Sequence, residues 1–189
     1  MYSLKLIALL TTSREPSYRT RSFIKDFSSV LPGVIRTHRG KKTLLELALE
    51  AKRFGAKYII IVGEKKGNPS IIRIYRLIPY SSTEIQEQLM KHIVTLILSG
   101  VKLSREMPEV FRTYNPSTIS IDPSMCSSEE CFMISDVFIK IFSEVLNPNP
   151  DVTLLVIEDR EGIRVEFRNR ARRPCGPVLR IKKVKIFGE

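Results

Sequence analysis

The chain has 189 residues, of which 43% are apolar and 27% are charged, and its net charge is +11. This composition excludes a disordered tail and is typical of a globular protein that buries a sizeable core as one large domain or two small ones. The apolar run at residues 4–10 is too short for a signal peptide or a membrane span, and the other apolar runs are strand-sized. We therefore expect a cytoplasmic protein with no membrane partner.

The first half of the chain predicts an α/β unit with helices packed on a mixed sheet. Helical spacing of apolar residues identifies two helices, and short β-rich runs identify the strands. The predicted elements are a strand at 2–10, a polar loop at 11–16, a helix from Pro16 or Ser17 to the Leu31-Pro-Gly stop, a strand at 34–37, a helix at 43–53, a strand at 58–62, a turn-rich loop at 63–69 and a strand at 71–77. The second helix is expected to turn Leu44, Leu47, Ala48 and Ala51 inward.

The second half echoes this order. A helix is expected to begin at Ser127 or Ser128, where a hydroxyl can cap it and the acids that follow favour its positive end, and to continue to Val145. The other predicted elements are a polar connection at 79–88, a strand at 93–103, an irregular proline-containing segment at 108–123, and strands at 152–157, 163–168 and 178–186 with a hairpin at 159–162. The fold class is therefore α/β, with two similar halves, mixed sheets and packed helices in one body.

The positive charge is concentrated in two regions. Residues 160–185 contain ten Lys or Arg and two acids, residues 13–42 contain eight and two, and the rest of the chain sums to −3. Charge of one sign on part of a surface attracts a polyanion and releases its counterions. Surface ion-pair networks also enrich charge, but they need near balance, which neither region has. The charge map therefore predicts a nucleic-acid-binding protein.

The basic residues follow predicted strands. Two of the loops join a strand to the next helix and so are expected on the same edge of the sheet, where backbone N–H groups and arginines can hold phosphates. No tryptophan is present, and the aromatics Tyr18, Phe111 and Tyr114 are not interleaved with the basic runs, which favours backbone recognition of folded RNA over base stacking. The candidate RNA-binding residues are Arg14, Arg19, Arg36, Arg39, Lys41, Lys42, Lys65, Lys66, Arg164, Arg168, Arg170, Arg172, Arg173 and Lys182.

The sequence contains no known catalytic motif, neither a phosphate-binding loop nor a nucleophile elbow. His38 lies among arginines, where a phosphate contact is expected, and His92 precedes an apolar strand and is expected to be structural or solvent-facing. Glu158 and Asp159 are adjacent, so on a strand they would point to opposite faces, and they are best interpreted as turn residues. We therefore predict no catalytic residues, no metal and no cofactor.

The three cysteines, Cys126, Cys131 and Cys175, do not have the spacing of a zinc site. Small buried or surface thiols are the favoured interpretation. A disulfide between Cys126 and Cys131 stays open, because intracellular disulfides occur in hyperthermophiles.

Several of these segments, taken together, resemble the Brix-domain family of ribosome-assembly factors, most closely its branch in the small-subunit processome. The resemblance covers TTSREPS at 11–17, FIKDF at 23–27, RTHRG at 36–40, YIIIVGEKKGNP at 58–69, the segment 152–170 and Gly176-Pro177. It implies a single Brix domain over residues 1–189, with halves at about 1–90 and 91–189 and a duplicated fold similar to the anticodon-binding domain of class II aminoacyl-tRNA synthetases. The absence of charged extensions is typical of an archaeal member.

The resemblance also implies non-catalytic binding of ribosomal RNA or its precursor during subunit assembly, with assembly proteins as further partners. Three alternatives stay open at this point. They are a tRNA-binding module, a scaffold whose basic faces bind acidic proteins, and an RNA-processing enzyme that uses Glu158 or Asp159.

Overall fold

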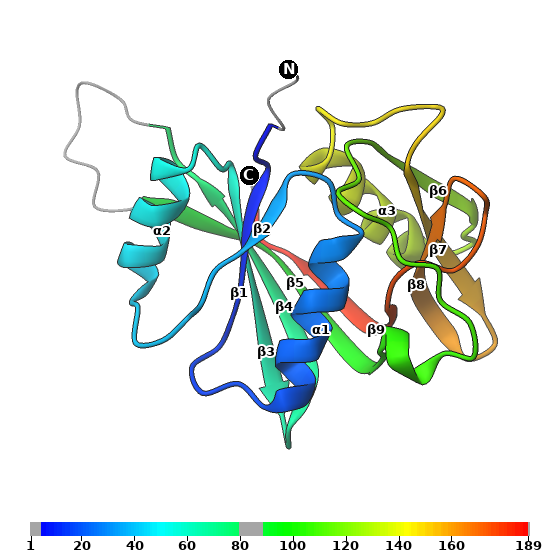
Figure 1. Cartoon of the computed structure of the whole chain (residues 1–189), viewed down its shortest axis with the longest axis horizontal. Helices are drawn as coiled ribbons and strands as arrows, with labels where there is room; N and C mark the ends of the chain where they lie inside the picture. Colours follow the sequence, from blue (N-terminus) through cyan, green and yellow to red (C-terminus); the bar gives the residue numbers. More distant parts are fainter. Residues whose placement is uncertain (1–4, 80–88, 189) are drawn as a thin grey trace.

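The computed structural model describes residues 5–79 and 89–188, which form one large mixed sheet with helices on both faces (Figure 1). Along the sheet the strand order is β2-β1-β3-β4-β5-β9-β8-β7-β6. The strands are β1 (Ala8–Thr12), β2 (Val34–Arg36), β3 (Tyr58–Lys65), β4 (Asn68–Leu77), β5 (Met90–Lys102), β6 (Ile119–Met125), β7 (Val152–Asp159), β8 (Gly162–Asn169) and β9 (Val178–Ile186). The helices are α1 (Tyr18–Ser29), α2 (Leu44–Arg53) and α3 (Glu129–Ile141), with a short 3-10 helix at Ser104–Glu106.

The same strand pattern occurs twice, which agrees with the prediction of two similar α/β halves. β1 pairs in parallel with β3, and β3, β4 and β5 then follow in antiparallel order. β6 likewise pairs in parallel with β7, and β7, β8 and β9 follow in antiparallel order. β5 and β9, the last strand of each series, pair with each other and join the two series into one sheet.

The helices begin where the capping residues predict. Ser17 accepts a hydrogen bond from the backbone N–H of Thr20, and Ser128 does the same for that of Cys131. Thr43 and Glu46 form a reciprocal capping box at the start of α2. Each cap satisfies N–H groups that the first helical turn would leave unpaired.

α1 and α3 lie on one face of the sheet, and α2 lies on the other. α1 and α3 share one continuous core, in which Phe27 packs edge-on against Phe167 of β8 at a ring separation of 6.0 Å. α2 covers a smaller cluster on Leu9, Ile59 and Ile61 of the first half. Among the described residues, no helix covers the α2 side of β9, β8 and β7, and no helix is long and apolar enough to cross a membrane.

Two strands differ from the prediction. β1 begins at Ala8 rather than at residue 2, and residues 2–4 of the predicted strand lie outside the described residues. It extends to Thr12 instead of ending at residue 10, because the buried Thr11 hydroxyl donates to the Thr37 carbonyl at 3.0 Å and so tolerates the interior. The segment predicted as irregular at 108–123 contains most of β6. Pro123 fits there because β6 is an edge strand, with an irregular register between Asp122 and Met125.

Smaller differences concern the ends of elements. α3 stops at Ile141 rather than Val145, because the chain turns there so that the Val145 carbonyl accepts from the Ile119 N–H at the start of β6. The predicted loop at 63–69 is mostly strand, with a turn at Lys66 and Gly67. Leu44, predicted inward, is exposed. The predicted connection at 79–88 falls almost wholly outside the described residues.

The favoured interpretation of Cys126 and Cys131 as thiols is wrong. They form a disulfide that joins the region after β6 to the first turn of α3. Neither the spacing nor the composition decides this pairing, which depends on the fold bringing the two Cα atoms to 5.4 Å. Cys175 is a buried free thiol.

Removing the disulfide should destabilise the protein. Closing so short a loop lowers the conformational entropy of the unfolded chain and so raises its free energy by about 2 kcal/mol. A Cys126→Ala/Cys131→Ala variant should therefore lose about that much free energy of unfolding. Urea denaturation measures it. Reductant should lower the stability of the wild type by a similar amount and leave the variant unchanged, and equal sensitivity of both proteins would contradict the prediction.

Candidate nucleic-acid interface

The loops that follow three parallel strands emerge at the same edge of the sheet. β1 pairs in parallel with both β2 and β3, so the segments that follow all three emerge together, as the sequence predicted for the first two. We call this region the carboxyl edge. Among its basic residues, Arg39 alone is buried. The predicted residues that the structure places here are Arg14, Arg36, Arg39, Lys41, Lys65 and Lys66.

Two predicted RNA-binding residues of this region are engaged within the protein. Arg19 forms an ion pair with Glu106 and donates to the Val101 carbonyl at 3.0 Å, and the Glu106 carboxylate raises the pKa of Arg19. Lys42 donates to the Glu50 carboxylate at 2.7 Å and lies 3.2 Å from the Thr37 hydroxyl. Burial raises the pKa of Glu50, but the hydrogen bonds from Lys42 and Thr37 outweigh it, so the net shift is downward. Both cations therefore have structural partners.

The register of the strands creates a second basic surface. Arg73 of β4 pairs with Thr95 of β5, which pairs with Lys185 of β9, while Lys183 pairs with Ile97. Arg180 of β9 pairs with Arg164 of β8. Residues paired side by side share a face of the sheet, and here it is the face opposite α1 and α3. We call it the open face. Its basic residues are Arg73, Arg164, Arg168, Arg180, Lys183 and Lys185.

Acidic neighbours hold the β8 arginines of the open face. The Glu166 carboxylate accepts from Arg164 Nε at 2.8 Å and from Arg168 Nη2 at 3.0 Å. Arg164 also contacts Asp159, and Arg180 contacts Glu161. A guanidinium has five N–H donors, so Arg168 keeps most of its donors for another acceptor while one fixes its orientation.

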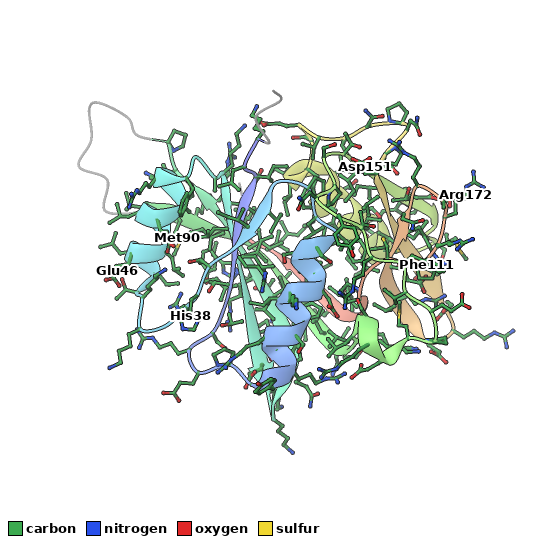
Figure 2. All side chains as sticks on the ribbon, viewed as in Figure 1. His38, Glu46, Met90, Phe111, Asp151 and Arg172 are labelled. Atoms are coloured by element: carbon green, nitrogen blue, oxygen red, sulfur yellow. A yellow bond between two sulfur atoms is a disulfide. The ribbon has the colours of Figure 1, made fainter. Side chains whose placement is uncertain are left out.

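The remaining predicted residues lie at the far end of the molecule or on β9. Arg170 contacts Asp151 at 3.2 Å, and the Arg173 guanidinium lies 4.5 Å from the ring centre of Phe111. Arg172 and Lys182 are exposed. Figure 2 shows His38, beside the carboxyl edge, in the left part of the molecule and Arg172 near its right end. The two basic stretches therefore do not converge on one point, and part of the second stretch lies on the open face.

Sequence reasoning missed an aromatic stack on the open face. The ring of His92 lies between Tyr75, at 4.9 Å, and Phe187, at 4.4 Å. His92 Nε2 lies 3.1 Å from the Val94 carbonyl and 2.8 Å from the Thr95 hydroxyl. The three aromatic residues come from β4, β5 and the segment after β9, so no local motif contains them. Only the strand register could have identified the stack.

Glu158 and Asp159 have structural roles. Glu158 accepts from the backbone N–H groups of Ser127 and Ser128, at 2.7 and 2.8 Å, just before α3. Hydrogen bonds from the hydroxyls and amides of these serines lower the pKa of Glu158 to about 2. Asp159 is the partner of Arg164. Neither carboxylate is poised as a general base.

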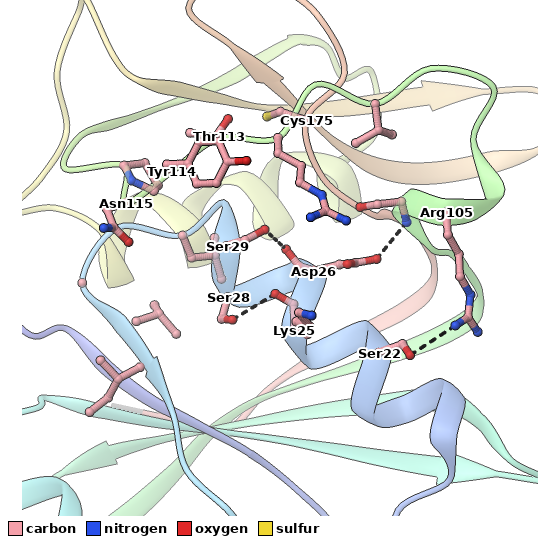
Figure 3. Close-up of a pocket in the computed structure, with 18 of the residues that line it drawn as sticks. Ser22, Lys25, Asp26, Ser28, Ser29, Arg105, Thr113, Tyr114, Asn115 and Cys175 are labelled. Atoms are coloured by element: carbon pink, nitrogen blue, oxygen red, sulfur yellow. Dashed lines mark hydrogen bonds between the residues drawn. The ribbon is translucent and has the colours of Figure 1, made fainter.

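The face that carries α1 is hollowed by a groove of about 800 Å³. Figure 3 shows Ser22, Lys25 and Ser28 of α1 on one side and Thr113 and Tyr114 on the other. Cys175 also lines this groove, but burial raises the pKa of its thiol, which keeps it protonated and a poor nucleophile. The groove therefore offers no activated cysteine.

Comparison with known proteins identifies the family to which this architecture belongs. A protein of Aeropyrum pernix, described as a probable Brix domain-containing ribosomal biogenesis protein, is 37% identical over 178 residues, which cover 92% of this chain and 94% of the relative. The chain belongs to the Brix-domain family of ribosomal biogenesis proteins. A Pyrobaculum aerophilum member is 30% identical over 182 residues, covering 93% of both chains. No family model matches the chain.

Solved structures agree with this assignment to the Brix-domain family. The crystal structure of a probable ribosomal biogenesis protein from Aeropyrum pernix has a TM-score of 0.78 at 34% identity and covers 94% of this chain and 96% of its own. Mil, an archaeal Imp4-like protein, has a TM-score of 0.65 at 22% identity, covering 95% and 99%, and so supports the fold alone. The predicted α/β fold and Brix family are confirmed, while the likeness to synthetase anticodon-binding domains and the division into halves near residue 90 stay predictions.

The aromatic stack should make stability depend on pH. Burial, aided by the charge of Arg73, holds the pKa of His92 below its usual 6.5. Below that pH the unfolded chain binds more protons than the folded one. The part of the free energy of unfolding that depends on His92 is therefore fully present above pH 6.5 and falls as the pH decreases. A His92→Phe variant keeps a ring in the stack and should lose less stability between pH 7.5 and pH 5. Urea denaturation at both pH values tests this, and equal losses in the two proteins would contradict it.

Proposed function

We propose that this Brix-domain protein is a non-catalytic RNA-binding factor in ribosome biogenesis that holds precursor ribosomal RNA by its backbone, with assembly proteins as further partners. The family role comes from its relatives, which are named ribosomal biogenesis proteins. RNA binding is inferred from the surface. A protein that contacts phosphates from a rigid sheet positions the RNA without reading its sequence.

The observation that carries the proposal is the continuity of the open face. One sheet spans both halves, so cations from β4, β9 and β8 share a single surface although they are far apart in the sequence. Lys183 and Lys185 are exposed on it, with no acidic partner among the described residues. Such unpaired cations can neutralise phosphates and release counterions.

The acidic groups of β7 and β8 argue for binding rather than chemistry. Glu158 is held by the serines that precede α3, and Asp159 and Glu166 are held by arginines of β8. A general base needs a free lone pair within reach of the proton that it removes. These carboxylates instead cap backbone amides and orient guanidinium groups, which suits a surface that presents fixed cations to a polyanion.

Salt dependence tests the proposal. If about five phosphates are neutralised, the logarithm of RNA affinity should fall against the logarithm of salt concentration with a slope of about −3.5 to −4.5. A Lys183→Gln/Lys185→Gln variant should reduce the size of that slope by about 1.5. Fluorescence anisotropy with a labelled precursor-rRNA fragment measures both.

The matched control is Arg21→Gln/Lys25→Gln, which removes the same charge from exposed positions of α1, on the opposite side of the sheet. It should leave the slope nearly unchanged. A flat salt dependence in the wild type, or equal effects of the two double variants, would overturn the proposed surface. Preferential binding of tRNA in competition would indicate a tRNA-binding module, and salt-sensitive binding of acidic proteins without RNA would indicate a scaffold.

A further inference from the structure

Arg39 is the one arginine among the described residues whose side chain is almost wholly buried and has no partner there. Only 8% of its surface is exposed, and its Nε and Nη1 atoms are buried without a hydrogen-bond acceptor. The ion pairs of the described residues do not include it. A buried charge without a partner destabilises the folded state, and Arg39 is such a charge in the free protein.

The surroundings of Arg39 are positive. Burial is the larger cause that lowers the pKa of Arg39, and the nearby charge of Arg14 lowers it further. The Tyr75 phenol acts weakly in the opposite direction. Two acids of α2 have other partners, since Glu46 caps the helix through Thr43 and lies in the field of Arg14, and Glu50 binds Lys42. Among the described residues, the Arg39 guanidinium thus lies near a second guanidinium and forms no ion pair.

The position of these two arginines suits a ligand. Arg14 follows β1, and Arg39 follows β2, the strand that pairs with β1 in parallel. The helices that these strands lead into lie on opposite faces of the sheet. In α/β sheets, ligands bind at the carboxyl ends of strands where the connections diverge in this way.

We propose that Arg39, with Arg14, is the binding position of one RNA phosphate, either a 5′-terminal phosphate or an internal phosphodiester. A guanidinium is a charge-assisted donor to phosphate oxygens, and the buried Nε and Nη1 atoms of Arg39, which have no acceptor in the free protein, would gain one when the side chain turns toward the phosphate. Arg73 lies on the same side of the sheet as the aromatic stack, and Tyr75 of that stack is near enough to Arg39 to affect its pKa, so an RNA strand held at Arg39 would continue onto the open face. This inference rests on the proposed function and names its most buried contact.

The test compares Arg39→Gln with Arg21→Gln, which removes the same charge from an exposed position of α1. Binding of short single-stranded RNA carrying a 3′ fluorophore, with a 5′ hydroxyl or a 5′ phosphate, is measured by anisotropy. Arg39→Gln should weaken binding at least about tenfold, because it removes a charge-assisted contact, and Arg21→Gln less than about threefold. A penalty seen only with the 5′ phosphate would identify a terminal phosphate as the ligand, and an equal penalty with both RNAs an internal one.

Stability provides the second readout. Because Arg39 is an unpaired buried charge, Arg39→Gln should keep or raise the melting temperature of the free protein, whereas a merely structural arginine would lower it. Arg39→Lys, which keeps the charge without the fork, should show intermediate affinity.

Three outcomes would count against the site. A lowered melting temperature for Arg39→Gln, or RNA affinity equal to that of Arg21→Gln, would overturn it while leaving RNA binding by the open face intact. Loss of affinity for a polyglutamate peptide, with RNA affinity unchanged, would overturn the assignment to phosphate. Absence of any RNA binding by the wild type would instead remove the proposed function itself.

Discussion

The surface of this protein depends on the antiparallel pairing of β5 with β9. That pairing joins the last strands of two similar four-strand series, so the two half-sheets become one. The register shifts near Leu98 allow Leu179 and Ile181 to face the shared core while Arg180 and Lys183 face away from it. A slip of one residue would exchange the two faces, burying the cations and exposing the core.

The same pairing holds the shared core together. The ring of Phe27 in α1 meets Phe167 of β8, and the chain after β8 approaches the end of α1 so closely that a side chain on Gly176 would lie 2.8 Å from a methyl group of Val30. These contacts connect a helix of the first series with a strand of the second. These contacts restrict rotation of the two series about the β5–β9 seam.

The sequence predicted local features well because they depend on neighbouring residues. The caps at Ser17, Thr43 and Ser128, the hairpin between β7 and β8 and the alternation of β4 are all fixed within a few positions. β6 was missed because Pro123 forbids a central strand but not an edge strand, and edge position is a property of the whole sheet.

The candidate site was less predictable, because it depends on contacts between distant segments. Arg73 belongs to neither basic stretch, yet the register puts it on the same face as Lys183 and Lys185. The aromatic stack likewise draws on three separate segments. Charge counting can identify that a protein is basic and where in the sequence its cations lie, but only pairing between strands determines which of them share a surface.

Arg19 and Arg39 show how far composition alone can mislead. Both are arginines of the same basic stretch, and both were predicted to contact RNA. The partner of Arg19 is Glu106, 87 positions away, which neutralises it and connects α1 to the segment after β5. Within residues 5–79 and 89–188 Arg39 has no such partner, although it is the more deeply buried of the two. Because an internal carboxylate competes with phosphate for the same donors, the cations best suited to bind RNA are those that the fold leaves unpaired.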